Sequence, residues 1–380
     1  MLPRRICSSA VLLCVLMATV LGVAGCGSGD KSAPPSFGPD IEARIDQLVN
    51  NAMSFSNIPG VIVGAWAPGQ GSYVKAYGMA DITSGEPMQT QDRVRIASIT
   101  KTFVATVALQ LVDEGRLGLD QTIAGYLPQI PQSGIITIRE LLNHSSGIYD
   151  YEDQAFIRSA AENPLKVWTP EQLIALAVSH PATFAPGSSC AYSNTNYIAL
   201  GLIIQQVTGN RLEDEITKRI IEPLNLSNTD FPVGPDMSGQ YSHGYMDMTN
   251  SGQLTDITRM DMSWDWAAGG MVSNLDDLKV WAEALGTGQL ISPAMQNERL
   301  KWISMPEFGN FASYGLGILK IGDFIGHTGA DPGYNSAMYY LPEKDAVIVV
   351  LFNYCSGTDI VDVTSLGIGK ALFPDVSLPF

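Results

Sequence analysis

Segments with strand periodicity lie at both ends of this chain, and helical segments fill its middle. Residues 61–77 are apolar and rich in β-branched side chains, with a Pro-Gly-Gln-Gly break at 68–71 that is typical of a hairpin. Further strand patterns follow near the end of the chain, at 314–325, 336–341 and 346–352. Between them, apolar residues recur at helical spacing in 137–144, 170–179, 195–208 and 211–223.

This order predicts a mixed α/β fold. Both ends of the chain would build one antiparallel sheet flanked by helices, with a mainly helical lobe, about 97–266, inserted between them. A helical pattern that starts at Ile41 opens the domain, and another at 359–372 closes it. A third runs from Ser98 to Gly115, and Asn194 or Thr195 is placed to cap the helix at 195–208.

The first 26 residues have the pattern of an export signal. Arg4 and Arg5 precede an apolar run at 11–24, which is shorter than the roughly 20 residues that a membrane-spanning helix needs. The run ends in Val-Ala-Gly-Cys26, which resembles a bacterial lipoprotein lipobox and implies that Cys26 is diacylated on sulfur. A plain signal peptide or an uncleaved anchor is the alternative, and each of these exports the protein. We expect a signal peptide at 1–25, a flexible tether at 26–40 and a folded domain at 41–380.

The charge balance excludes one class of partner. The 380 residues include 22 Lys and Arg against 38 Asp and Glu, a formal net charge of −16. Removal of the signal takes away Arg4 and Arg5 and leaves −18. Such a surface repels nucleic-acid phosphate and anionic lipid. We therefore expect no nucleic-acid partner, and attachment to the extracytoplasmic face of the bacterial membrane through the lipid on Cys26.

Two cysteines are left for the folded domain. Cys7 and Cys14 lie in the signal and Cys26 would carry lipid, so Cys190 and Cys355 remain. A pair outside the cytoplasm could oxidise, but we expect two separate buried thiols. The sequence has no Cys-x-x-Cys and no paired histidines, so it predicts neither a metal site nor another cofactor.

The motif Ser-x-x-Lys occurs three times, at Ser28/Lys31, Ser72/Lys75 and Ser98/Lys101. The first copy lies in the tether, and the second lies on a predicted strand, where residues three apart point to opposite faces. The third copy begins a helix, where positions i and i+3 share a face. Ser98 is thus the serine whose lysine is held within reach. Burial would lower the pKa of Lys101 from its usual value of about 10.4 and make it a base or an electrostatic partner. A capping serine followed by a surface lysine is the alternative that further motifs must exclude.

Two further motifs supply polar groups that could act with this serine. Tyr192-Ser193-Asn194 lies in a loop before a helix, where the phenol could relay a proton and the amide could hold Lys101 or a substrate amide. His327-Thr328-Gly329 follows a predicted strand. A histidine there could adjust Tyr192 or orient substrate, and the glycine permits a close backbone approach.

The three motifs, in this order, resemble the serine β-lactamase/penicillin-recognising superfamily. The Tyr-x-Asn and His-Thr-Gly forms are similar to the branch that holds class C β-lactamases, serine D-alanyl-D-alanine carboxypeptidases and related esterases. Residues 138–147 and 267–273 fit that branch as well, and the resemblance covers roughly residues 41–375. The His144-Ser145-Ser146-Gly147 stretch would be a structural loop in this family, and not a catalytic dyad.

The resemblance implies a role for each motif residue. Ser98 would be the acylated nucleophile and Lys101 its partner, and Tyr192 would be the general base that also activates the hydrolytic water. The groups that position Lys101 or hold and orient the substrate would be Asn194, His327, Thr328 and Gly329. The oxyanion hole would be the backbone N–H groups of Ser98 and Ala330.

The substrate is less well defined by these motifs. The His form of the triplet favours a D-alanyl-D-alanine carboxypeptidase-like hydrolase that acts on peptidoglycan peptide and is acylated by β-lactams. The alternatives are an esterase or weak β-lactamase of the same chemistry, and an inactive lipoprotein that binds wall peptide. A carboxypeptidase needs a cation for the terminal carboxylate, and in the strand before His327 only Lys320 offers one. Trp264 and Trp266 could line the cleft or lie in the core. We expect a monomer whose substrate is a small peptide or ester.

Overall fold

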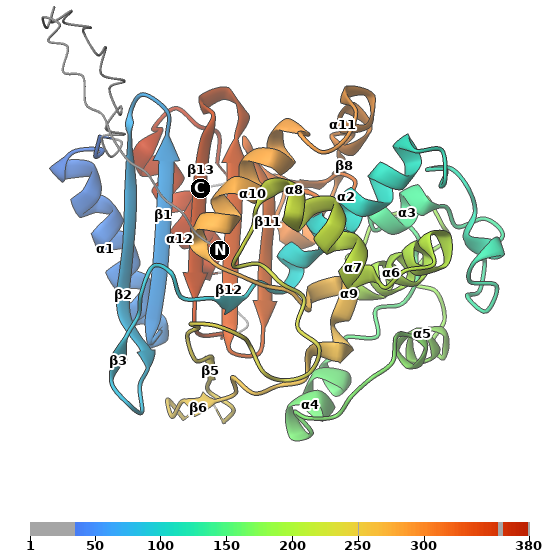
Figure 1. The fold of residues 1–380 in the computed structure, drawn as a ribbon, viewed down its shortest axis with the longest axis horizontal. Helices are drawn as coiled ribbons and strands as arrows, with labels where there is room; N and C mark the ends of the chain where they lie inside the picture. Colours follow the sequence, from blue (N-terminus) through green and yellow to red (C-terminus); the bar gives the residue numbers. More distant parts are fainter. Residues whose placement is uncertain (1–34, 250, 356–359, 379–380) are drawn as a thin grey trace, which may run out of the picture. The chain divides into compact units, whose positions relative to one another are not determined.

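The computed structural model describes residues 35–249, 251–355 and 360–378, so the predicted signal, Cys26 and most of the predicted tether lie outside the described residues. Nine strands form one antiparallel sheet in the order β3-β2-β1-β13-β12-β11-β10-β9-β8 (Figure 1). Their bounds are β1 (Gly60–Ala67), β2 (Gly71–Asp81), β3 (Glu86–Pro87), β8 (Ile303–Ser304), β9 (Ala312–Tyr314), β10 (Leu319–Ile321), β11 (Phe324–Asp331), β12 (Tyr334–Leu341) and β13 (Ala346–Phe352). Strand β1 pairs with β13, so the two ends of the chain share this sheet as predicted.

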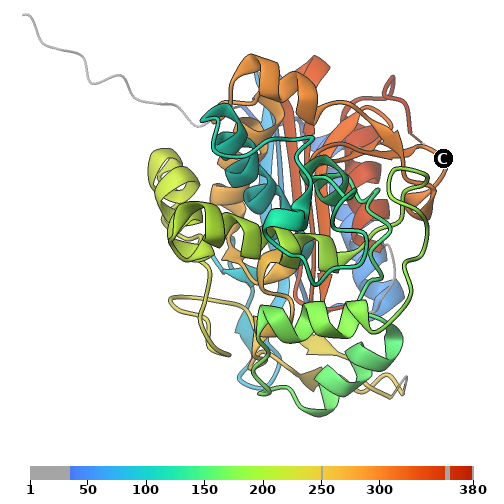
Figure 2. The same cartoon turned by 90° about the vertical axis from the view of Figure 1, so that its right-hand side faces the viewer.

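Both faces of the sheet are covered, which explains why β12 and β13 are buried along their whole length. One face packs on the terminal helices α1 (Pro39–Ser56) and α12 (Ile360–Leu372). The other face packs on α10 (Leu275–Thr287) and on the helical lobe, which Figure 2 shows turned toward the viewer. Helix α11 (Pro293–Arg299) follows α10 and leads into β8. The prediction of a mixed α/β fold with an inserted helical lobe is confirmed.

The lobe is mainly helical, as predicted. Its helices are α2 (Thr100–Asp113), α3 (Ile138–Leu142), α4 (Gln154–Glu162), α5 (Pro170–Val178), α6 (Asn194–Thr208), α7 (Leu212–Ile216), α8 (Glu222–Leu224) and α9 (Trp266–Gly269). Two short two-stranded sheets accompany them, β4 (Val94–Arg95) with β7 (Val272–Ser273) and β5 (Tyr245–Met246) with β6 (Thr255–Asp256). Among the described residues, no helix is long and apolar enough to cross a membrane.

Two predictions of local structure are wrong. The single strand expected at 314–325 is instead the end of β9, the whole of β10 and the start of β11, because the glycines between them turn the chain. Gly317 and Gly322 have φ angles of 73° and 58°, a region that favours glycine. His327-Thr328-Gly329 therefore lies within β11 and does not follow a strand.

The predicted caps and helix starts also shift. Ser193 is the N-cap of α6 and Asn194 is its first residue, with the Asn194 side chain hydrogen-bonded to Glu152. Helix α1 begins at Pro39, two residues before the predicted Ile41, and Ser36 already forms a bridge with Ser72 of β2.

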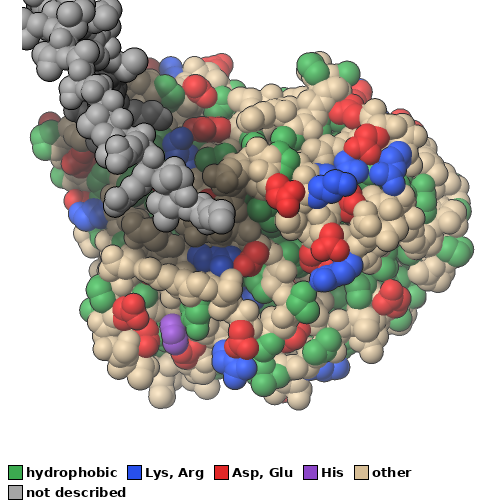
Figure 3. Space-filling view, in the orientation of Figure 1, with side chains coloured by type: hydrophobic (Ala, Val, Ile, Leu, Met, Phe, Trp, Pro, Cys, Tyr) green, Lys and Arg blue, Asp and Glu red, His purple; other side chains and the backbone are tan. Residues whose placement is uncertain are grey.

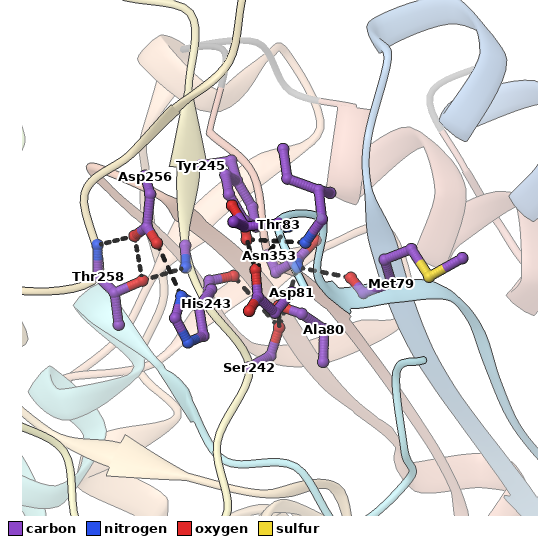
Figure 4. Close-up of polar contacts among 12 residues, drawn as sticks. Met79, Ala80, Asp81, Thr83, Ser242, His243, Tyr245, Asp256, Thr258 and Asn353 are labelled. Atoms are coloured by element: carbon purple, nitrogen blue, oxygen red, sulfur yellow. Dashed lines mark hydrogen bonds and ion pairs between the residues drawn. The ribbon is translucent and has the colours of Figure 1, made fainter. Parts of the chain in front are cut away.

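A polar cluster links residues 242–245, and with them Asp256 and Thr258, to the ends of β2 and β13 (Figure 4). The Asn353 carboxamide donates from Nδ2 to the Met79 carbonyl at 3.0 Å and to Ser242 Oγ at 2.9 Å. His243 Nδ1 lies 2.7 Å from Asp256 Oδ2 in the same cluster. Because these polar groups are hydrogen-bonded to one another, we assign the cluster a structural role.

Candidate active site

Ser98 lies in a tight 3₁₀ turn, Ala97–Ile99, that leads directly into α2. Ala97 has a φ of 49°, a strained conformation for a residue with a side chain. One turn later, Lys101 Nζ lies 2.8 Å from Ser98 Oγ and donates to the Ala268 carbonyl at 2.8 Å. In contrast, Ser72 and Lys75 lie on β2, where Lys75 binds Asp46. The helical Ser-x-x-Lys copy therefore has its two side chains in contact.

Lys101 is fully buried. Burial lowers the pKa of its ammonium below the usual lysine range, while the carboxylates of Asp265 and Glu152 act in the opposite direction. A lowered pKa makes the neutral amine accessible, and a neutral Nζ has a lone pair for the proton of Ser98.

Tyr192 stands on the loop before α6, with Lys101 Nζ 4.9 Å from the centre of its ring. Burial raises the pKa of the Tyr192 phenol well above its usual value, although the neighbouring Ser98 hydroxyl lowers it. The hydroxyl is buried and forms no hydrogen bond with the described residues. The raised pKa means that Tyr192 keeps its proton as a phenol near pH 7.

The ring of His144 packs against the ring of Tyr192. Its ring lies 4.4 Å from the Tyr192 ring and 4.7 Å from that of Tyr314, and Nδ1 accepts the Ser193 N–H at 3.2 Å. Burial holds the pKa of His144 well below its usual value. The neutral ring thus fixes the Tyr192 loop, in agreement with a structural role for the His144–Gly147 stretch.

Asn194 contacts carboxylates in place of the expected Lys101. Its Nδ2 donates to Glu152 at 2.6 Å and to Asp150 at 3.2 Å, and its backbone N–H donates to Asp150 at 3.1 Å. The amide therefore holds Asp150 and Glu152 at the rim of the serine site, and both belong to the segment that follows the His144 loop.

His327 has both ring nitrogens engaged. Nδ1 lies 2.6 Å from the Thr328 carbonyl and donates to it, so Nε2 accepts the hydroxyl of Tyr314 at 2.7 Å. Burial lowers the pKa of His327 to about 3, and Lys101 in its protonated form acts in the same direction. The imidazole is therefore neutral near pH 7 and brings no positive charge to the cleft.

Gly329 brings β11 against the serine turn. A Cβ on Gly329 would meet the Ile96 carbonyl oxygen at 2.3 Å and Ala97 Cβ at 2.9 Å, so only glycine fits there. Ala330, the next residue, lines the same cleft as Ser98. This close approach is what a shared oxyanion hole of the two backbone N–H groups requires.

Of the site residues predicted from the motifs, all except the buried Lys101 border one cleft of ≈ 230 Å³. It is lined by Ser98, Glu152, Tyr192, Asn194, Asp265, Phe308, His327, Thr328, Gly329, Ala330, Asp331, Asn335, Val361 and Asp362. Four of these described residues are acidic, and none is Lys or Arg. Lys320 does not border the cleft but lies 5.6 Å from the centre of the Trp302 ring, while Trp264 and Trp266 belong to the core.

The carboxyl groups near Ser98 crowd one another. Burial raises the pKa of Glu152 and of Asp331 well above the usual range, and the neighbouring Asp265 raises both further. The pKa of Asp265 itself is raised by burial, and that of Asp150 is raised to about 6, again mainly by burial. A cation in the cleft would relieve this crowding and favour the ionised carboxylates.

Cys190 is a thiol whose Sγ lies 3.4 Å from the Asn143 carbonyl oxygen, in agreement with separate cysteines, but it is half-buried and not buried as predicted. In the described part of the chain, no group of three His, Cys, Asp or Glu residues could hold a metal ion.

The motifs did not reveal every residue of the cleft. Glu152, Asp265 and Asp331 form its acidic wall, and Phe308 lines it. Of these, Glu152 had a visible signal, because it lies in an acidic stretch soon after the His144 loop. Asp265, Asp331 and Phe308 reach the cleft only through the tertiary structure.

Comparison with known proteins agrees with this geometry. The Beta-lactamase family model matches residues 45–365, and the chain therefore belongs to the β-lactamase family of serine hydrolases. Among curated relatives, D-aminopeptidase of Brucella canis is 28% identical over 328 residues, which are 83% of this chain and 60% of that protein. Penicillin-binding protein 4* of Bacillus subtilis is 26% identical over 298 residues, 74% of this chain and 65% of that protein. The chain thus spans less than two thirds of the length of these relatives.

Two solved structures are similar over almost their whole length. A D-stereospecific amidohydrolase from Streptomyces sp. has 32% identity and a TM-score of 0.78, with 87% of this chain and 98% of that chain covered. The D-amino acid amidase from Ochrobactrum anthropi SV3, complexed with L-phenylalanine amide, has 27% identity and a TM-score of 0.75, with 88% and 98% covered.

Proposed function

We propose that this enzyme hydrolyses the amide bond that follows a single D-amino acyl residue with a free amino group, as a D-amino acid amidase or aminopeptidase. The acidic wall of the cleft carries this proposal. Glu152, Asp265 and Asp331 border the cleft beside Ser98. A substrate ammonium would supply the positive charge that this wall lacks, and hydrogen-bond donors for Asp265 Oδ1 and Asp331 Oδ2, which have no partner among the described residues. The D-specific amidohydrolase and amidase structures support the choice of a D-amino acid.

The charge of the cleft argues against the predicted carboxypeptidase. A terminal carboxylate needs a cationic partner, but no described residue lining the cleft is Lys or Arg, and His327 is neutral. Acylation by β-lactams, which also carry a carboxylate, should be weak for the same reason. Esters of D-amino acids need no such cation and remain suitable alternative substrates.

Acylation follows from the contacts around Ser98. The neutral amine of Lys101, 2.8 Å away, takes the Ser98 proton as Oγ attacks the substrate carbonyl carbon. The N–H groups of Ser98 and Ala330 would hold the resulting oxyanion. As the C–N bond breaks, the Tyr192 phenol donates its proton to the leaving nitrogen and is reprotonated by Lys101. The resemblance to the family implied Tyr192 as the base, and the pKa directions of the two groups favour Lys101 in that role.

Deacylation reverses these roles with water in place of the amine. Lys101, or Tyr192 acting with it, removes a proton from a water that attacks the acyl ester, and Ser98 recovers its proton as the D-amino acid leaves. Lys101 and the groups that line the cleft account for both halves of the reaction.

The proposal is tested by incubating the purified protein with three substrates, D-alaninamide, L-alaninamide and a wall pentapeptide that ends in D-Ala-D-Ala. We expect ammonia from D-alaninamide at the highest kcat/KM, little from the L form, and little D-alanine from the pentapeptide. Preferential release of D-alanine from the pentapeptide would restore the carboxypeptidase assignment, and hydrolysis of none of them would refute the proposal.

Glu152→Gln should raise the KM for D-alaninamide about tenfold or more, because it removes a charge-assisted partner of the substrate ammonium. N-acetyl-D-alaninamide has no charge at this position and should be a poor substrate for the wild type. Its KM should differ less between the wild type and Glu152→Gln than the KM for D-alaninamide does. Asp236→Asn, an exposed carboxylate far from the cleft that pairs with Arg259, is the matched control. Equal KM values for Glu152→Gln and the control would contradict an ammonium site at Glu152.

We further propose that the enzyme is exported and held at the membrane by lipid on Cys26, as the lipobox pattern predicts. The acidic charge of the chain supports a lipid anchor over electrostatic attachment. Cys26→Ser should move the protein from the membrane fraction of the producing bacterium to the soluble fraction. Labelling with a fatty-acid probe should be lost in the same variant, and membrane retention of Cys26→Ser without the label would contradict this anchor. The monomeric state remains a prediction, and one structural relative, from Pyrococcus abyssi, is described as octameric.

A further inference from the structure

The departing half of the substrate must lie beside Tyr192. The leaving nitrogen has to receive a proton when the C–N bond breaks, and Lys101 and Tyr192 are the groups that carry the Ser98 proton in the proposed reaction. Lys101 is fully buried behind Ser98, so the proton reaches the cleft through the Tyr192 phenol. Any substituent on the leaving nitrogen therefore extends along the wall of the cleft next to Tyr192.

That wall is apolar. Phe308 ends the short 3₁₀ turn Pro306–Phe308, and its ring meets the Tyr192 ring edge-on, with centroids 5.4 Å apart. The turn is attached to the tyrosine loop, because the backbone N–H of Tyr192 donates to Glu307 Oε2 at 2.9 Å. Phe308 is half-buried and lines the cleft, and so does Val361 at the start of α12. Among the described residues that line the cleft, Phe308 and Tyr192 have the large apolar side chains, and Val361, which is only 2% exposed, adds a small apolar area.

The same wall is unsuited to an anion. Glu307 accepts from the Tyr192 N–H, and Asp362 borders the cleft next to Val361, while no described lining residue is Lys or Arg. A leaving group with a free carboxylate would meet negative charge without a cationic partner. A leaving group with an uncharged apolar substituent would instead bury it against Phe308.

We propose that Phe308, Tyr192 and Val361 form a leaving-group subsite that selects uncharged, apolar N-substituents, such as the aryl or alkyl part of a secondary amide. This inference rests on the proposed function, since it specifies the second half of the same substrate. The preferred substrates are thus N-substituted D-amino acid amides, or peptides whose second residue is apolar and carries no free carboxylate. Their products are the D-amino acid and a neutral amine.

The experiment compares three amides of D-alanine with the wild-type protein. These are the primary amide, the N-benzyl amide, and the N-(4-carboxybenzyl) amide, which differs from the second by one carboxylate. The carboxylate has no cationic partner in the subsite, so kcat/KM should be about tenfold lower for the carboxybenzyl amide than for the benzyl amide. Burial of the ring on Phe308 should raise kcat/KM for the benzyl amide about tenfold over the primary amide. A carboxybenzyl amide that is hydrolysed as well as the benzyl amide would overturn the subsite.

Two variants in one loop locate the effect. Phe308→Ala should reduce the ratio of kcat/KM for the benzyl amide to that for the primary amide by about tenfold. Phe311→Ala is the matched control, because Phe311 is 53% exposed three residues further on and does not line the cleft. If a substitution disturbs Tyr192, kcat/KM falls for both amides, and the ratio of the two values is unchanged. Equal ratios in both variants would refute the subsite while the primary amide is still hydrolysed, whereas hydrolysis of none of the amides by the wild type would refute the proposed function with it.

Discussion

Replacing Ser98 with alanine should abolish amide hydrolysis, with kcat reduced about 10⁶-fold, because Ser98 Oγ is the cleft hydroxyl that contacts the base Lys101. Ser98 is positioned by a strained turn at Ala97 and by Lys101 Nζ at 2.8 Å. Alanine fits the same turn, so the fold should be kept. Release of ammonia from D-alaninamide measures the loss, and thermal unfolding monitors the fold.

Ser72→Ala is the matched control for this result. Ser72 has the same Ser-x-x-Lys spacing, but it lies on β2, and its lysine is engaged with Asp46. Ser72→Ala should keep wild-type activity. Loss of activity in Ser72→Ala, with Ser98→Ala active, would show that helical spacing does not select the nucleophile.

Lys101→Met should lower kcat about 10³-fold, because it removes the base while it fills the same buried volume. Lys101→Arg should not restore activity, since the arginine side chain stays protonated. Methionine avoids an unpaired buried charge, so this variant should fold. Activity of Lys101→Arg near that of the wild type would contradict a role for the neutral amine.

The pH dependence of the wild type gives the sign of the same effect. Burial lowers the pKa of Lys101, so the amine is neutral above that lowered pKa and protonated below it. kcat/KM should therefore rise with pH through the lowered pKa and fall in acid, as Lys101 takes up a proton. The raised pKa of Tyr192 keeps its phenol available across the neutral range. In Lys101→Met the residual rate should lose this acidic limb, and a limb that persisted there would be due to another group.

The sequence allowed the prediction of those parts of the site that depend on local spacing. Ser98 and Lys101 meet because they are one helical turn apart, and β13 was predicted with its observed bounds, 346–352, because a run of apolar, largely β-branched residues ends at a polar turn. The glycines within 314–325 were hidden in an apolar pattern, so three strands were predicted as one.

Tertiary structure determines the parts that local patterns do not show. Asn194 was expected to hold Lys101, but the chain brings Asp150 and Glu152 to it from a segment more than 40 positions earlier. His327 was expected to be available to substrate, but Tyr314 from a neighbouring part of the sheet occupies its Nε2. A partner that comes from a distant segment leaves no periodic signal, and a carboxyl group becomes part of a site only when burial places it there.

The charged side chains on the surface indicate less about function than those in the cleft. In the face drawn in Figure 3, acidic and basic side chains alternate over the helical lobe, and no strongly basic area is visible there. The chemistry of the molecule is concentrated in the cleft, where buried carboxyl groups and a buried lysine surround a single serine.

The most direct test of this account is to trap the acyl-enzyme. The protein is mixed with an ester or amide of D-alanine, quenched in acid and digested, and the peptides are weighed by mass spectrometry. We predict one added alanyl group on the peptide that contains Ser98, and its absence in Ser98→Ala. An alanyl group on another residue, or turnover of D-alaninamide by Ser98→Ala at the wild-type rate, would contradict the account.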